Sequence, residues 1–212
     1  MSSQSIEDYN GSALIALCGT SSYILCTDTR YGIQAQTISC SNTSKSFHVG
    51  DECMVGIGGL QTDIDTVRKE VLFKSEQYLL SHSDVKTLKF NQLSKMLSNM
   101  LYAKRFGPYF ISPIVAGFDG KDGKPVLSAM DCIGAPVISR DFAVSGTCTA
   151  NLYGLAETYY RPDMGDDELF EVGCQTLLAA ADRDALSGWG GKVTMVRKDG
   201  GRREWRLKGR MD

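Results

Sequence analysis

Histidine is nearly absent from this sequence. Only two occur among the 212 residues, His48 and His82. Catalysis with histidine as the general base therefore has little to draw on. The glycine-rich motifs that hold dinucleotides and nucleotide phosphates, the H-E-x-x-H motif of zinc peptidases and the G-x-S-x-G motif of α/β-hydrolases are also missing. We interpret both histidines as ordinary surface or partly packed side chains.

A basic excess and long apolar runs are lacking as well. Lys and Arg total 23 against 25 for Asp and Glu, which leaves a formal net charge of -2 and no surplus to neutralise a phosphate backbone. No apolar run approaches the roughly 20 residues that cross a bilayer. Residues 1–9 are polar and do not resemble a signal peptide. We therefore expect no nucleic-acid partner, no membrane contact and a location in the cytoplasm or the nucleus.

Paired cysteine motifs are missing too, although cysteine itself is present. The seven cysteines are an odd number and form no C-x-x-C pair, which favours reduced thiols over a disulfide framework or a zinc site. The acidic runs at 163–168 and 182–184 are interpreted as helix ends and ion pairs, because neither has the spacing of a calcium loop. We expect no metal and no cofactor.

The hydrophobic pattern predicts groups of strands separated by pairs of helices. Short apolar runs predict strands at 12–18, 23–28, 53–58, 111–119, 124–131, 142–146, 192–197 and 203–207. Apolar residues at intervals of three and four predict helices at 62–81, 87–106, 151–160 and 167–182. Thr62 or Asp63 is the expected N-cap of the first helix.

This order of elements predicts an α+β fold. Strands joined mostly by hairpin turns form antiparallel sheets, and each pair of helices can cover one outer face. The expected architecture is a four-layer α-β-β-α sandwich, with two antiparallel sheets between two helical layers. A chain of this length, 42% hydrophobic, supports one core. We expect a single domain at 10–212, after a polar leader at 1–9 that is retained.

A set of potential site residues is spread along the chain, mostly near the ends of these elements. In order they are Gly11-Ser12, Asp28, Lys45, Gly58-Gly59, Gly146-Thr147 and the run 183–188. Their order and spacing resemble those of proteasome β-subunits, members of the N-terminal-nucleophile hydrolase family, over almost the whole chain from residue 10. The resemblance implies the same four-layer fold. In active members of that family a Gly-Thr bond is cut autocatalytically, and the freed threonine hydroxyl is the nucleophile.

Active members of this family do their chemistry without histidine. A lysine held by an aspartate, or the freed amine, accepts the hydroxyl proton, and backbone N–H groups beside a glycine bind the oxyanion. By resemblance, the matching positions here are Ser12 for the nucleophile, Asp28 and Lys45 for the aspartate and the lysine, Gly59 for the oxyanion hole, Asp184 and Ser187 for a second acid and a serine, and Thr147 for another serine.

Two departures from the active pattern predict that this set is degenerate and that no residue is catalytic. Serine stands at position 12 where active members have threonine. The spacing from Asp28 to Lys45 is also one residue longer than expected, which would displace the base. Four further stretches resemble an unprocessed, non-catalytic class of eukaryotic β-subunit, at 31–36, 102–109, 144–148 and 207–212.

The resemblance therefore implies a structural subunit that takes part in ubiquitin-dependent protein degradation. Its expected partners are the other α and β subunits of the 20S core particle, in heteroheptameric rings of a twenty-eight-subunit assembly, and the polypeptide substrates in the chamber. Residues 130–135 are expected to face a neighbouring trypsin-like subunit, where Asp131 and Ala135 line its substrate pocket and Asp131 attracts Lys or Arg. The alternative is that Asp131 merely ends a strand.

Two other functions are compatible with the same residues. Cleavage after Gly11 would expose Ser12 as the nucleophile of a slow, self-processed serine peptidase or amidase that uses Lys45 as its base. A self-assembling ring of identical subunits is the third possibility. It is disfavoured because every subunit of such a ring would lack the threonine.

Overall fold

The structure is a computed structural model that describes residues 6–34, 36–39, 44–82 and 87–209. Some of the sequence predictions therefore lie partly outside the described residues. These are the start of the leader, at 1–5, residue 35 of the stretch at 31–36, and residues 210–212, which end both the stretch at 207–212 and the predicted domain. In the described part of the leader, Ile6–Asp8 form a single 3-10 turn, η1.

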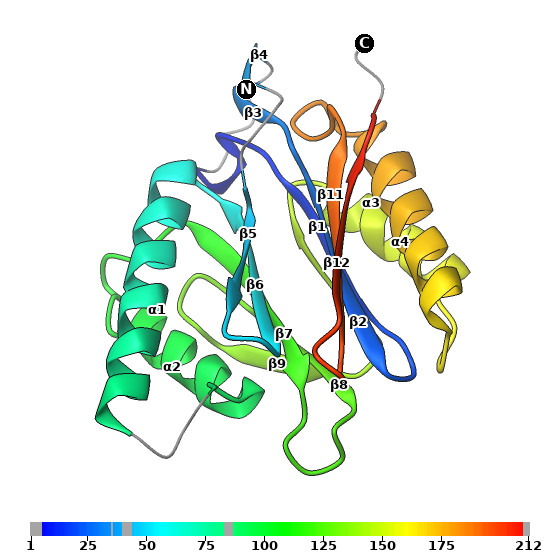
Figure 1. Cartoon of the computed structure of the whole chain (residues 1–212). Helices are drawn as coiled ribbons and strands as arrows, with labels where there is room; N and C mark the ends of the chain where they lie inside the picture. Colours follow the sequence, from blue (N-terminus) through cyan, green and yellow to red (C-terminus); the bar gives the residue numbers. More distant parts are fainter. Residues whose placement is uncertain (1–5, 35, 40–43, 83–86, 210–212) are drawn as a thin grey trace.

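Two five-stranded antiparallel sheets lie face to face in the described part of the chain (Figure 1). The first has the order β10 (Phe142–Gly146), β1 (Ala13–Cys18), β2 (Ser22–Asp28), β11 (Gly191–Arg197) and β12 (Arg202–Leu207). The second has the order β5 (Ser46–Val49), β6 (Cys53–Gly59), β7 (Ile111–Phe118), β8 (Pro125–Met130) and β9 (Pro136–Ser139). A separate two-stranded ribbon consists of β3 (Tyr31–Ile33) and β4 (Gln36–Ser39).

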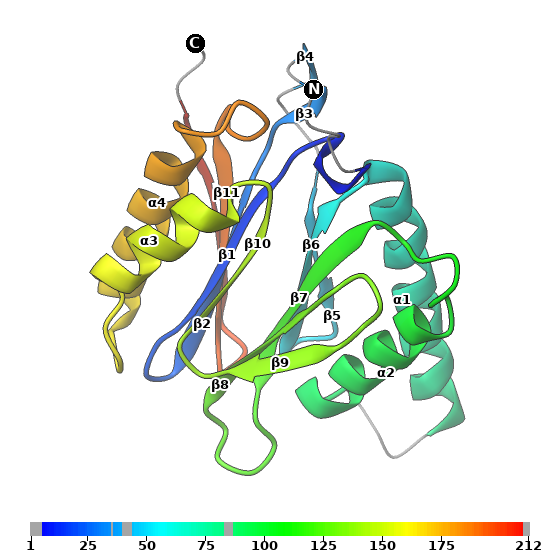
Figure 2. The ribbon, with the colours of Figure 1, turned by 180° about the vertical axis from the view of Figure 1, so that it is seen from behind.

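Helices cover both outer faces of the sheet pair. The second sheet is covered by α1 (Gln61–Ser81) and α2 (Phe90–Tyr102), and the first by α3 (Thr149–Tyr159) and α4 (Asp166–Ala181), as the front and back views show (Figures 1 and 2). The four-layer α+β sandwich predicted from the sequence is therefore confirmed. No helix in the described ranges is both long and apolar enough to span a bilayer.

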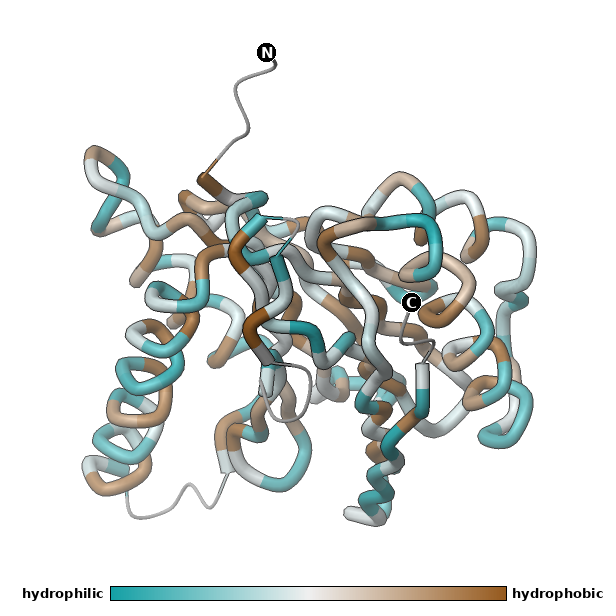
Figure 3. Tube along the Cα trace, turned by 90° about the horizontal axis from the view of Figure 1, so that it is seen from above, coloured by the Kyte–Doolittle hydropathy of each residue, from teal (hydrophilic) through white to brown (hydrophobic). Residues whose placement is uncertain are grey.

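Three apolar clusters hold the four layers together. The central cluster lies between the two sheets and includes Leu14, Leu25 and Ile114, all almost completely buried. Two outer clusters fill the spaces between each sheet and its pair of helices. Figure 3 shows hydrophobic and hydrophilic residues alternating along the chain, as layers with one buried face require. Burial of these side chains is the main favourable contribution to the fold.

The start of α1 differs from the sequence prediction. Neither Thr62 nor Asp63 is the N-cap, because the helix begins one residue earlier and its N-cap is Leu60, which provides no side-chain hydrogen bond. The free N–H of Gln61 is instead bound by the side chain of Asn10, whose Oδ1 accepts it at 2.9 Å. A residue fifty-one positions away thus supplies the cap, which local sequence patterns do not reveal.

Other differences concern short or exposed elements. The pattern predicts a helix at 87–106, whereas α2 is shorter at both ends. At its start the Lys89 N–H donates to Gln92 Oε1 (3.0 Å), which fixes the first turn there, and after Tyr102 the exposed chain continues as separate turns. Four strands are not among the predicted runs, namely β3, β4, β5 and β9. Each has only three or four residues, too few to show a clear apolar period.

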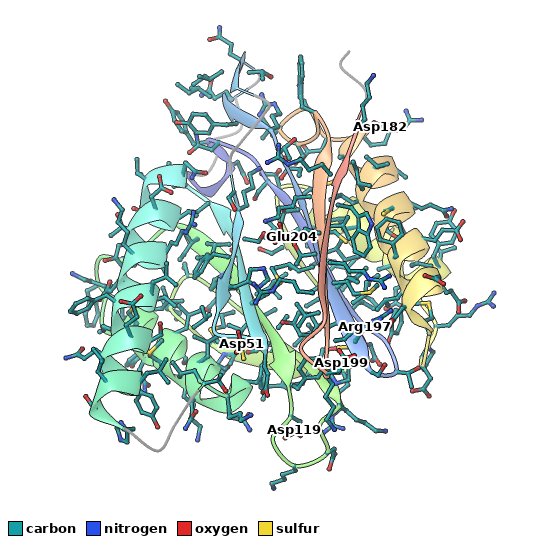
Figure 4. All side chains as sticks on the ribbon, viewed as in Figure 1. Asp51, Asp119, Asp182, Arg197, Asp199 and Glu204 are labelled. Atoms are coloured by element: carbon teal, nitrogen blue, oxygen red, sulfur yellow. The ribbon has the colours of Figure 1, made fainter. Side chains whose placement is uncertain are left out.

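The two sheets are linked by a hydrogen bond between β5 and β12. His48 Nε2 in β5 lies 3.2 Å from Glu204 Oε1 in β12, and Lys192 Nζ of β11 lies 3.2 Å from the same oxygen. Glu204 is labelled in Figure 4, between the strands of the two sheets. Burial lowers the pKa of His48, and the nearby positive charges of Arg202 and Lys192 lower it further. The hydrogen bond with Glu204 and its negative charge act in the opposite direction and raise the pKa. His48 Nδ1 is buried and has no hydrogen-bond partner among the described residues.

The burial of His48 predicts a loss of stability in acid. Because the pKa of His48 is lower in the folded chain than in the unfolded one, its contribution is complete above about pH 6.5 and declines as the pH falls. Urea unfolding at pH 7.5 and pH 5.5 should show a larger loss for the wild type than for His48→Gln. His82→Gln, at the exposed end of α1, is the matched control and should follow the wild type. An equal pH dependence of all three proteins would contradict the prediction.

Candidate functional site

The residues singled out by resemblance meet at one end of the sandwich. Ser12 precedes β1, Asp28 ends β2, Lys45 precedes β5 and Gly59 ends β6. Thr147 follows β10, and the loop between α4 and β11 carries Asp184 and Ser187. Because neighbouring strands are antiparallel, the start of one and the end of the next lie at the same end of the sheet. The described leader and the β3–β4 ribbon are at this end too, at the top of Figure 1.

A buried ion pair lies at the centre of this cluster. Lys45 Nζ donates to Asp28 Oδ1 at 2.6 Å, and the two side chains are only 2% and 0% exposed. Asp28 also accepts backbone N–H groups of Ala13 (3.0 Å) and Gly188 (3.3 Å). A carboxylate buried in this way is stabilised by three donors, one of which carries a full positive charge.

The longer spacing between Asp28 and Lys45 does not displace the lysine from its aspartate, so that expectation is wrong for the Asp28 contact. The position of Lys45 is fixed by the second sheet, because its carbonyl accepts the Ile57 N–H (2.8 Å) and the next residue pairs with Gly56. The chain between β2 and β5 contains the ribbon β3–β4, which belongs to neither large sheet. An extra residue there can be accommodated without moving either strand.

The chemistry of Lys45 is set by its surroundings. Burial lowers the pKa of Lys45, and the charge of Asp28 opposes this effect. A lysine with a lowered pKa is suited to accept a proton near neutral pH. Its second hydrogen bond, however, goes to the carbonyl oxygen of Gly11 at 3.1 Å, and neither described bond of Nζ is made to the hydroxyl of Ser12.

Ser12 is buried, and its hydroxyl group makes no hydrogen bond with the described residues. It fits a narrow space between two glycines, since a Cβ added to Gly58 or to Gly146 would lie 2.7 or 2.6 Å from it. The backbone nitrogen of Ser12 is a peptide N–H that donates to Thr147 Oγ1 (3.2 Å). In this arrangement the hydroxyl lacks a base and the nitrogen is not a free amine.

A second polar network holds the other side of Ser12. Thr147 Oγ1 lies 2.7 Å from Asp184 Oδ2, and Ser187 Oγ donates to the same oxygen at 2.5 Å. The other oxygen of Asp184 accepts the Leu186 N–H at 3.1 Å, which orders the loop. Threonine at 147 thus provides a hydroxyl at the position where the family usually has serine.

Gly59 lies at a backbone position that other residues rarely adopt. Its φ is +122°, and an added Cβ would lie 2.2 Å from the carbonyl oxygen of Phe110. Gly59, Gly146 and Thr147 contribute to the lining of a pocket of about 240 Å³, which is also bordered by Asp8 of the leader. The described leader therefore reaches the mouth of the site.

Asp131 and Ala135 are exposed, on the turn between β8 and β9. One carboxylate oxygen of Asp131, Oδ1, accepts the backbone N–H groups of Ile133 (3.1 Å) and Ala135 (2.8 Å). The side chain therefore orders this turn, as Asp does in many turns, while the carboxylate remains at the surface.

Two buried residues of this region had no role in the sequence analysis. Asn10 is 5% exposed and Arg30 is 1% exposed, the latter among the largest fully buried side chains. Arg30 lies two residues after Asp28, but arginine after a strand is usually a surface residue, so its burial is not indicated by the sequence. No group of three or more His, Cys, Asp or Glu side chains suited to a metal ion occurs within the described ranges.

A four-layer sandwich with this cluster at the ends of its strands defines an N-terminal-nucleophile hydrolase fold. Residues 9–196 match the family model described as "Proteasome subunit". The chain therefore belongs to the proteasome subunit family. Members of this family assemble with other proteasome subunits.

Curated relatives extend over nearly the whole chain. A "Proteasome subunit beta type-3" of Drosophila melanogaster is 46% identical over 208 residues, which cover 98% of this chain and 100% of the relative. Relatives of the same name are 45% identical in Dictyostelium discoideum (91% of this chain, 92% of the relative) and 39% identical in Saccharomyces cerevisiae (90% and 91%). Type 3 is the non-catalytic class that the four sequence stretches resemble, so the predicted resemblance is confirmed.

The buried ion pair predicts a strong coupling between its two partners. Lys45→Met should leave Asp28 buried without its cation, and Asp28→Asn should leave the ammonium buried without its anion, so each should lower the free energy of unfolding by about 3–5 kcal/mol. The double variant should lose less than the sum of the two, by about 0.5–3 kcal/mol. Urea unfolding of the four proteins measures this coupling.

The control for this cycle is an exposed pair of the same charges. Glu70 and Lys74 lie one helical turn apart in α1, with their charged atoms 3.3 Å apart at the surface. Glu70→Gln and Lys74→Met should each change the free energy of unfolding by well under 1 kcal/mol. Equal effects at the buried and the exposed pair would contradict the central position of Asp28 and Lys45 in the fold.

Proposed function

We propose that this chain is a non-catalytic, structural β-subunit of the 20S proteasome core particle. The observation that carries the proposal is the state of Ser12, whose buried hydroxyl has no described partner while Lys45 donates to Asp28 and to the Gly11 carbonyl. The similarity to type-3 β-subunits over nearly the full chain supports the same function. In this function the chain takes part in ubiquitin-dependent degradation by forming part of the β ring.

The proposal extends to the assembly and to the chain itself. The partners are the other α and β subunits, in heteroheptameric rings around a chamber that receives polypeptide substrates, and the location is the cytoplasm and the nucleus. The leader at 1–9 is retained before a single domain at 10–212. The packing of Asp8 beside the pocket and the burial of Asn10 support retention of the leader.

The seven positions carried over by resemblance are then the structural remnant of a catalytic site. Asp28 and Lys45 stabilise the interior by their ion pair, and Thr147, Asp184 and Ser187 order the neighbouring loop. Gly59 allows the sharp exit from β6, and Ser12 fills the space between the glycines. Each residue has a structural contribution that does not depend on catalysis.

One observation favours a second function. Lys45 Nζ lies 3.1 Å from the carbonyl oxygen of Gly11, where it can polarise the bond that self-processing would cut. Cleavage there would free the amine of Ser12 and give a serine peptidase or amidase. The idle hydroxyl makes this the weaker candidate, because no described group is in place to remove its proton.

The two functions differ in the mass of the purified chain. We expect intact-mass spectrometry to show the leader still attached, allowing for loss of the initiator methionine, because Ser12 lacks a base in contact with its hydroxyl. Lys45→Met should give the same pattern of leader retention. A mass equal to residues 12–212 in the wild type, and its disappearance in Lys45→Met, would replace the structural function by the enzymatic one.

We also propose that Asp131 and Ala135 line the substrate pocket of a neighbouring subunit. Both residues are exposed on one turn, and one oxygen of Asp131 orders that turn. An exposed carboxylate held in a fixed turn can attract a Lys or Arg side chain of a substrate. Its role in the turn and its role in the pocket can be separated, because asparagine keeps the accepting oxygen but not the charge.

This separation gives a test in the assembled particle. Asp131→Asn should lower the hydrolysis of peptides with Lys or Arg before the cleaved bond by about twofold to fivefold, since one partly exposed ion pair contributes up to about 1 kcal/mol. Asp131→Ala should have at least this effect, and hydrolysis after apolar residues should be unchanged. Asp199→Asn is the matched control, because Asp199 also accepts a backbone N–H in an exposed turn, that of Gly201. Identical kinetics for Asp131→Asn and Asp199→Asn would remove Asp131 from the pocket.

A further inference from the structure

The chain changes from exposed to buried between Tyr9, the last residue of the leader, and Asn10. Tyr9 is 41% exposed, whereas Asn10 is 5% exposed and Gly11 is buried. At Tyr9 the carbonyl oxygen already accepts the Gln34 N–H of the β3–β4 turn at 2.8 Å. The leader therefore enters the interior of this end of the sandwich just before β1 begins.

The side chain of Asn10 links β3 to the start of α1 by two hydrogen bonds. Its Nδ2 donates to the Gly32 carbonyl in β3 at 2.8 Å. Its Oδ1 accepts the Gln61 N–H at the start of α1 at 2.9 Å, where the helix has no side-chain cap of its own. The Asn10 side chain thus binds a carbonyl of the ribbon and the N–H at the start of a helix that has no side-chain cap of its own.

Arg30 holds the same region from the inside. Its guanidinium takes part in no ion pair among the described residues and is surrounded by neutral oxygens. Nη1 donates to Leu186 O (2.9 Å) and, at 3.5 Å, to Asn10 O, Nη2 donates to Gln34 O (2.8 Å), and Nε donates to Thr37 Oγ1 (3.2 Å). A buried cation needs such acceptors, because its desolvation is costly without them.

The path of the chain before β1 requires glycine at position 11. Its φ is +73°, and an added Cβ would lie 2.1 Å from the carbonyl oxygen of Leu186, which is itself bound by Arg30. Its own carbonyl oxygen accepts from Lys45 Nζ. Leader, ribbon and the α4–β11 loop therefore meet at buried hydrogen bonds on both sides of the Gly11-Ser12 bond.

We propose that residues 9–11, called the strap below, are a permanent internal element that closes this end of the sandwich. The strap ties the start of α1, the β3–β4 ribbon and the loop at 183–188 through Asn10 and Arg30. This inference rests on the proposed function, in which the leader is not removed. Its consequence is that loss of the strap loosens all three segments, so that cleavage after Gly11 would disorder the site instead of activating it.

The test compares Asn10→Ala with Asn91→Ala in the full chain. Asn91 is an exposed residue of α2, so the control makes the same chemical change at the surface. Hydrogen exchange should become at least about tenfold faster at 31–34 and 61–64 in Asn10→Ala only, because the two side-chain hydrogen bonds that are lost end in these segments. The Tm should fall by about 5 °C in that variant and stay unchanged in the control.

Two further variants identify which contact acts where. Asn10→Asp keeps the oxygen that caps α1 and loses the donor to Gly32, so exchange should rise at 31–34 and remain slow at 61–64. Arg30→Lys keeps the charge but not the planar set of donors, so exchange should rise at 31–34 and 183–188. These two milder changes carry the test if Asn10→Ala does not fold.

The outcomes separate this inference from the proposed function. If Asn10→Ala, or the milder variants in its place, exchange as slowly as Asn91→Ala at all three segments, the strap is overturned. A full-length mass would still support the structural subunit in that case. A chain found cut after Gly11 would overturn the proposed function, and unchanged protection in the cut chain would overturn the strap as well.

Discussion

The ion pair between Lys45 and Asp28 is the interaction on which this end of the molecule depends. It joins the end of β2 in one sheet to the start of β5 in the other, with the two charged atoms 2.6 Å apart and almost no solvent access. Such a pair is tolerated only when its remaining hydrogen-bonding capacity is filled. Here that requirement positions Gly11, Ala13 and Gly188 around it, and so determines where the leader and the α4–β11 loop pass.

The position of Ser12 follows from these constraints. Lys45 donates to the Gly11 carbonyl, and Thr147 accepts the Ser12 N–H, so both polar groups of the Gly11-Ser12 peptide are held. The hydroxyl then points into the narrow space between Gly58 and Gly146, where it meets backbone and no base. A site that retains the lysine, the aspartate and the second acid can therefore remain assembled while its nucleophile is idle.

The fold could be predicted from the sequence to the level of its layers, since β1 and β7 are mainly apolar runs and α4 has apolar residues at helical spacing. The set of site positions came from the resemblance of their order and spacing to those of proteasome β-subunits. Two features could not be predicted, because they depend on contacts between distant residues. Asn10 caps α1 across fifty-one positions, and Arg30 is buried by carbonyl groups from three separate segments. Neither carries a local pattern.

Persistence of the charged residues without catalysis has a physical explanation. Replacement of either Lys45 or Asp28 alone leaves an uncompensated charge in the interior, which costs more than keeping both. The same holds for the oxygens of Asp184, which bind two hydroxyls and an N–H that would otherwise lack partners. Replacement of the nucleophile alone therefore costs little stability, whereas replacement of the charged residues around it costs much more. The cluster around Ser12 can therefore stay assembled by its own hydrogen bonds, whether or not chemistry takes place at Ser12.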